Sequence, residues 1–132
     1  MTRAVPQLVQ RESLDLVVAN SENAAAGSGL TVANYREISG CGVDCITLGD
    51  HIYRRKEISR VLESEDNIVK PANYAPEAPG KEFAIVPARN NVQVGVVSLL
   101  GRVFMRPVDC PWHAADRVLE QLAPQVKVIL VD

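Results

Sequence analysis

The chain has 132 residues, the length of one ordinary domain, so two independent hydrophobic cores are not expected. Hydrophobic residues make up 47% and charged residues 23%, which excludes a disordered or fibrous chain. The formal net charge is -2 and no large basic cluster occurs, so there is no nucleic-acid footprint. The apolar runs are too short to cross a bilayer, and no secretion signal opens the chain. We therefore expect a cytoplasmic protein with no membrane partner.

Periodic apolar residues predict alternating helices and strands along the first half of the chain. Helices are expected over residues 4–12, 31–40 and 54–63, and buried strands over residues 14–19, 43–48 and 67–70. Thr31 suits the N-cap of the second helix, and the polar, glycine-rich residues 21–29 predict a loop.

The second half of the chain begins with a Pro/Ala/Gly-rich loop and then predicts a hairpin. The loop covers residues 71–80, and strands 83–87 and 92–99 flank a turn in which Asn90 and Asn91 tolerate positive φ. Pro111 suits the first turn of a helix, and residues 127–131 predict a last buried strand. The order of elements predicts a layered α/β sheet, mostly parallel, with one β-hairpin.

Both ends of this predicted fold look incomplete. A doubly wound sheet normally begins with a strand, whereas here a helix comes first. The chain also stops at the carboxyl end of a strand, where such folds place their ligands. We therefore expect a single partial domain over residues 1–132. Its exposed sheet edge and apolar face predict self-association, so a homo-oligomer is an expected assembly.

Acidic residues and a histidine follow two strands that should be neighbours in the sheet. Glu22 comes just after the first strand, and Asp50 and His51 come just after the next. Neighbouring strands lie about 4.8 Å apart, so the two carboxylates can converge on one point, where they repel unless a cation or a proton lies between them. An equally weighted alternative is that Glu22 and Asp50 cap the following helices and that His51 is an ordinary surface histidine.

Four segments add a more specific pattern: A-N-S-E-N-A-A-A-G at 19–27, T-L-G-D-H at 47–51, V-K-P-A-N-Y at 69–74 and L-L-G-R-V-F-M at 99–105. Together they resemble the YmdB-like branch of calcineurin-like metallophosphoesterases. That family carries N-G-E-N-A-A-G-G, G-N-H, R-P-A-N-Y and G-R-V-F-M segments in the same order. The likeness extends over essentially the whole chain.

The resemblance implies a four-layered α/β fold that holds two divalent metal ions, usually iron or manganese. It also implies hydrolysis of phosphodiesters, with 2',3'-cyclic nucleotides among the small substrates. Glu22 stands at the place of the metal-bridging glutamate, and Asp50 at that of the metal-binding asparagine. His51 stands at the place of the proton donor, and Asn23 at a position that orients substrate or neighbouring groups.

The sequence also departs from the family pattern. The family's opening G-D strand, with its metal-binding aspartate, and its later F-H-A-E and G-T-H-T-H segments are not among these residues. Asp50 replaces a neutral ligand by an anionic one, which should hold a cation more tightly and lower its Lewis acidity. We therefore expect the 132-residue chain by itself to bind divalent metal weakly and to be inactive or nearly so.

Two other functions compete with the metal-dependent phosphodiesterase. One is a non-catalytic remnant or interaction module that keeps the same scaffold. The other is a nucleotide-binding domain that uses Gly27, Ser28 and Gly29 as a phosphate loop, a weak pattern without the third glycine of the usual motif. The segments that flank this chain in its reading frame would discriminate the first alternative from an enzyme.

The remaining chemically active residues are interpreted as structural. The three cysteines are an odd number without secretory context, so they should be reduced, with Cys41 and Cys45 as small apolar filler near a strand start. His113 lies at the start of the last helix and is interpreted as structural. Arg102 is expected to pair with a carboxylate.

Overall fold

The computed structural model describes residues 3–132. Its helices are α1 (Ala4–Glu12), α2 (Val32–Gly40), α3 (Ile58–Ser64) and α4 (Pro111–Leu122). Its strands are β1 (Val18–Asn20), β2 (Cys45–Thr47), β3 (Ile68–Val69), β4 (Phe83–Pro87), β5 (Gln93–Val97) and β6 (Val128–Val131).

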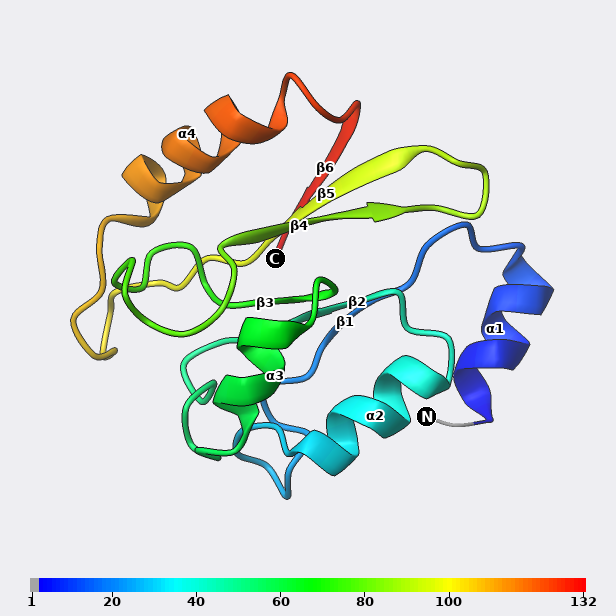
Figure 1. The fold of residues 1–132 in the computed structure, drawn as a ribbon, viewed down its shortest axis with the longest axis horizontal. Coiled ribbons are helices and arrows are strands. Elements are labelled where there is room, and N and C mark those ends of the chain that lie inside the picture. The colour runs from blue at the N-terminus through cyan, green and yellow to red at the C-terminus, as the bar shows by residue number, and fades with distance from the viewer. Residues whose placement is uncertain (1–2) are drawn as a thin grey trace.

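The strands form two three-stranded sheets rather than one continuous sheet. The first sheet has the order β1-β2-β3 and is entirely parallel; the second has the order β4-β5-β6, with β4 antiparallel and β6 parallel to β5. The sheets lie face to face, with α2 and α3 outside the first and α4 outside the second (Figure 1). The mixed α/β fold and the hairpin expected from the sequence are therefore confirmed, in four layers.

Three apolar clusters fill the three interfaces between these layers. The first, which includes Ile38, Ile46 and Leu62, packs α2 and α3 against the first sheet. The second lies between the sheets and consists of the buried residues Cys45, Val69, Ala84, Val86, Ala88, Val94 and Val96. The third packs α4 against the second sheet through Val97, Val118 and Leu122, among others. Each layer is therefore held by burial of apolar surface, the main favourable term in folding.

The local signals in the sequence are borne out at several positions. Thr31 caps α2, since its hydroxyl accepts a hydrogen bond from the Asn34 backbone N–H at 3.1 Å. Asn91 adopts φ +63° in the hairpin turn, as expected for asparagine, and Pro111 opens α4. The 71–80 loop contains no helix or named strand.

Two elements begin four residues later than the sequence predicts. The strand expected from residue 14 begins at Val18, because the Val17 N–H donates to the Asp44 carboxylate at 2.8 Å and Arg89 donates to the Leu14 carbonyl at 3.1 Å. Side chains thus occupy the Val17 N–H and the Leu14 carbonyl, while the Asp15 carbonyl accepts from the backbone of Arg89 outside the first sheet. The helix expected over 54–63 begins only at Ile58, because the preceding residues form successive turns after β2.

The prediction that the last strand is buried is wrong. In β6, Val128, Leu130 and Val131 are 49%, 37% and 52% exposed. The cause is its position at the edge of the second sheet, where it pairs with β5 alone. Among residues 3–132, no helix has the length and apolar character needed to cross a membrane.

Candidate active site

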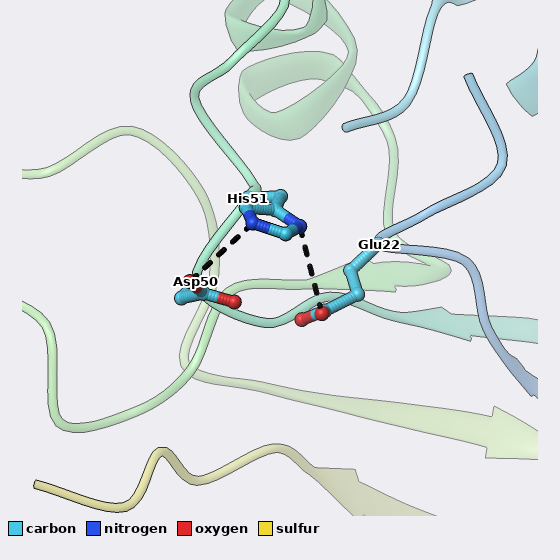
Figure 2. A group of neighbouring side chains, drawn as sticks. All are labelled: Glu22, Asp50 and His51. Atoms are coloured by element: carbon cyan, nitrogen blue, oxygen red, sulfur yellow. Dashed lines mark ion pairs between the residues drawn. The ribbon is translucent and has the colours of Figure 1, made fainter. Parts of the chain in front are cut away.

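The loops after β1 and β2 leave the same rim of the first sheet. Parallel pairing aligns Asn20 with Thr47, so the residues that follow both strands emerge side by side. Glu22, Asp50 and His51 each offer a ligand atom within 4.8 Å of the others. The His51 ring lies between the carboxylates, with Nδ1 3.8 Å from Glu22 Oε1 and Nε2 3.6 Å from Asp50 Oδ2 (Figure 2). The structure thus brings together the three residues singled out in the sequence.

The cluster is partly sheltered from solvent. The side chains of Glu22, His51 and Asp50 are 20%, 28% and 38% exposed, respectively. A site of this kind is open enough to admit a ligand, yet its charges are less screened than those of fully exposed side chains. Among the described residues, this is the one cluster of histidine, cysteine or acidic side chains with the geometry to hold a metal ion.

Gly49 makes room for the Glu22 carboxylate. A β-carbon added at Gly49 would overlap Glu22 Oε2, so any other residue there would displace the carboxylate from the rim. Glu22 is also anchored through its own backbone, because its carbonyl accepts a hydrogen bond from the Gly29 N–H at 2.6 Å. The glycine before Asp50 is therefore part of the site, although it carries no functional group.

Asn23 connects the histidine to the glutamate. Its Nδ2 donates to Glu22 Oε1 at 3.1 Å, and its Oδ1 lies 2.8 Å from His51 Nδ1. Because a carboxylate only accepts hydrogen bonds, the asparagine amide must face Glu22 with its NH2 group and His51 with its oxygen. His51 Nδ1 then donates its hydrogen to Asn23, and the other ring nitrogen, Nε2, lies on the side of Asp50.

A second set of polar contacts supports the rim from the other sheet. Asp132, at the end of β6, accepts hydrogen bonds from Thr47 Oγ1 and from Asn20 Nδ2, the latter at 2.8 Å. Asn20 Oδ1 in turn accepts from the Glu22 backbone N–H at 3.2 Å. This support was not predicted from the sequence, in which the only signal was that Asn20, Thr47 and Asp132 are all polar residues at strand ends.

The alternative in which Glu22 and Asp50 cap helices is wrong. The N-cap of α2 is Thr31, nine positions after Glu22, and the N-cap of α3 is Glu57, seven positions after Asp50. Neither carboxylate is therefore needed to satisfy a helix terminus. Helix capping therefore does not explain why the two carboxylates lie close together.

The other residues interpreted from the sequence lie outside this cluster. Cys41 and Cys45 are buried and unpaired, and burial raises the pKa of Cys45 to about 12. His113 is exposed in the first turn of α4. The carboxylate partner expected for Arg102 is not found among the described residues. Arg102 lies instead beside Cys110, whose pKa is lowered mainly by the backbone N–H groups of His113 and Trp112.

The fold and a family model place the chain among known proteins. Two sheets packed between helical layers form a layered α/β arrangement of the calcineurin-like fold. The family model described as YmdB-like protein matches residues 1–132, and the chain belongs to this family. The resemblance carried by the four sequence segments is thereby confirmed.

Relatives of known sequence or structure cover nearly the whole chain. A protein of Bacillus subtilis (strain 168) named 2',3'-cyclic-nucleotide 2'-phosphodiesterase is 36% identical over 128 residues, which are 97% of this chain and 48% of that protein. The crystal structure of a hypothetical protein from Thermus thermophilus has a TM-score of 0.85 and 40% identity, and covers 98% of this chain and 49% of that one.

A third match shows the fold alone. The crystal structure of a protein described as a novel phosphatase, from Mycoplasma pneumoniae, has a TM-score of 0.84 with 23% identity, and covers 99% of this chain and 48% of that one. In all three comparisons, this chain spans about half the length of the protein that it matches.

Proposed function

We propose that this chain contributes to the active site of a metal-dependent phosphodiesterase that acts on small phosphodiesters, with 2',3'-cyclic nucleotides among its substrates. The observation that carries the proposal is the convergence of Glu22, Asp50 and His51 within 4.8 Å on one rim of the first sheet. The name of the Bacillus subtilis relative supports the substrate class.

The residues present fit a divalent cation of the first transition series. Two carboxylates that approach each other repel unless positive charge lies between them, and no lysine or arginine makes an ion pair with Glu22 or Asp50 within residues 3–132. Carboxylate oxygens together with imidazole suit iron or manganese. Glu22 and Asp50 would hold the ions, and a centre of two ions would take its further ligands from outside these residues.

The side chains of the cluster have distinct roles in the proposed reaction. The bound ions would lower the pKa of water and neutralise charge on the phosphate oxygens. His51 would hold a proton on Nε2 and deliver it to the alkoxide oxygen as the P–O bond breaks. Asn23 would keep His51 in the required orientation by accepting the Nδ1 hydrogen, and would orient substrate on its exposed side.

The test uses the complete gene product that contains these residues. Hydrolysis of adenosine 2',3'-cyclic phosphate with Mn²⁺ should fall about 100-fold or more in His51→Ala, as expected for loss of a general acid. The matched control is His113→Ala, which removes the second histidine of the chain and should leave turnover unchanged. Equal turnover in both variants, or hydrolysis that persists when the metal is chelated, would refute the proposal.

A further inference from the structure

A pocket lies directly beside the cluster and shares Asp50 with it. Its volume is about 260 Å³, and its lining residues are Asp50, Tyr53, Arg54, Tyr74 and Arg106. They come from the turns after β2, from the 71–80 loop and from the segment between β5 and α4. The pocket therefore lies next to the place where a phosphate held at the cluster would carry its attached group.

The pocket carries two arginines that make no ion pair within residues 3–132, alongside one carboxylate, that of Asp50. Neither Arg54 nor Arg106 forms an ion pair or a side-chain hydrogen bond with any residue in the described part of the chain. By contrast, Arg89 pairs with Asp44 and Arg117 pairs with Glu82. Two free guanidinium groups that line one pocket favour an anionic ligand, above all phosphate, whose oxygens match their donor geometry.

The aromatic wall of the pocket is fixed before any ligand arrives. The rings of Tyr53 and Tyr74 meet edge to face, with centroids 5.5 Å apart and planes at 85°. The Tyr53 hydroxyl donates to the Pro79 carbonyl at 2.7 Å. The loop that carries Tyr74 is held from beneath by Lys70, whose buried ammonium donates to the carbonyls of residues 75, 76 and 78. A preformed aromatic surface beside arginines suits a nucleoside that bears a phosphate.

We propose that this pocket binds a second, non-scissile phosphate of the substrate between Arg54 and Arg106, while the attached nucleoside lies against Tyr74. The inference rests on the proposed function, because that function supplies the class of substrate, whereas the preference for a second phosphate comes from the pocket itself. It predicts that a cyclic nucleotide with an additional phosphate is preferred to one without. The second phosphate can be the 5'-phosphate of a mononucleotide or the internucleotide phosphate of an oligonucleotide.

The test is a binding measurement without metal, so turnover plays no part in it. Isothermal titration calorimetry in a chelating buffer would compare three probes: adenosine 2',3'-cyclic phosphate, its 5'-phosphorylated form, and the dinucleotide ApA ending in a 2',3'-cyclic phosphate. At least one of the two-phosphate probes should bind about 10-fold more tightly than the first. The stronger of the two identifies the source of the second phosphate.

Substitutions in the pocket test whether the gain in affinity for a two-phosphate probe comes from its two arginines. Arg54→Gln and Arg106→Gln should each remove most of the preference for the second phosphate, whereas Arg60→Gln, which removes an equal charge from the exposed face of α3, should keep it. Equal affinity for all three probes, or an equal loss in Arg60→Gln, would overturn the inference. Absence of hydrolysis in the complete gene product would count against the proposed function but would leave this binding result unaffected.

Discussion

The two sheets differ in how completely they are covered, and the candidate active site lies on the better-covered one. Every residue of β2 and β3 is buried, with helices on one side and the second sheet on the other. In the second sheet, β5 is largely buried, but β6 leaves most of its side chains exposed. Catalytic groups need fixed positions. Asp50 and His51 follow β2, which is central and fully buried, whereas Glu22 follows β1, a partly exposed edge strand of the same sheet.

The largest expected effect is a difference in stability between matched leucines of the two regions. Leu62→Ala, in the core beneath the first sheet, should lower the free energy of unfolding by about 2–5 kcal/mol, because a fully buried leucine leaves a cavity. Leu130→Ala, in β6, should cost less than about 1 kcal/mol, since that side chain is already 37% exposed. Urea denaturation measures both, and equal losses would show that β6 is as well packed as the core.

The next effect concerns the rim itself. Gly49→Ala should weaken binding of Mn²⁺ about 10- to 100-fold, because the added methyl group takes the place of the Glu22 carboxylate. Calorimetric titration with Mn²⁺ measures the change. Gly101→Ala is the control, since a β-carbon there meets no atom within 4 Å and should leave metal affinity unchanged. If both variants bind Mn²⁺ like the wild type, Gly49 does not set the position of Glu22.

A smaller effect is expected in the loop beside the proposed phosphate pocket. Lys70→Met should cost about 1–3 kcal/mol, because three backbone carbonyls lose a charged donor. Burial lowers the pKa of Lys70, which shows that the buried charge is costly to desolvate. Because methionine removes this charge, the loss of folding free energy is limited. Limited proteolysis should show faster cleavage within residues 71–80, while Lys127→Met, at an exposed lysine, should show none of this change. Unchanged cleavage in Lys70→Met would contradict the role of the ammonium in ordering the loop.

Alkaline pH provides a further comparison. Burial raises the pKa of Tyr53 to about 12 from 10.0, so the folded state holds this proton more tightly than the unfolded state. The associated stability is present below pH ~10 and is lost as pH rises toward ~12. In Tyr53→Phe, the free energy of unfolding should therefore fall less steeply over this interval than in the wild type. Identical slopes in the two proteins would exclude Tyr53 as a contributor to alkaline unfolding.

The last effect is a difference in reactivity between cysteines. Cys45 is buried with a pKa of about 12, whereas Cys110 is partly exposed and its pKa is lowered. The thiolate is the reactive form, so iodoacetamide at neutral pH should modify Cys110 first. Mass spectrometry of the folded protein should find one label per chain, and Cys110→Ser should remove it. A label on Cys45 under the same conditions would show that β2 opens readily.

Local signals in the sequence predicted much of the fold, because each depends on a few adjacent residues. The cap at Thr31, the turn at Asn91 and the first helical position at Pro111 are decided within one turn of chain. The start of α3 and the exposure of β6 could not be predicted in this way. The first depends on the turns that place His51 at the rim, and the second on which strand lies at the sheet edge.

The site could be predicted at the level of residue types but not of its internal contacts. The positions of Glu22, Asp50 and His51 after consecutive parallel strands predicted that they can meet, with helix capping as an equally weighted alternative, and the structure places them together. Two features depend on how the two loops fit against each other. One is the space beside Gly49 that the Glu22 carboxylate fills, and the other is the orientation of Asn23 between Glu22 and His51. Periodicity and spacing contain no information about such a fit.

The contacts of Asp132 give the rim a dependence on the whole sandwich. The Asp132 carboxylate joins the end of β6 to Asn20 and Thr47. If the second sheet detached, the Asn20 side chain, which accepts a hydrogen bond from the Glu22 backbone N–H, would lose this partner. Closure of the sandwich therefore helps to hold the start of the Glu22 loop at the rim, so a substitution in the second sheet can disturb the site from a distance.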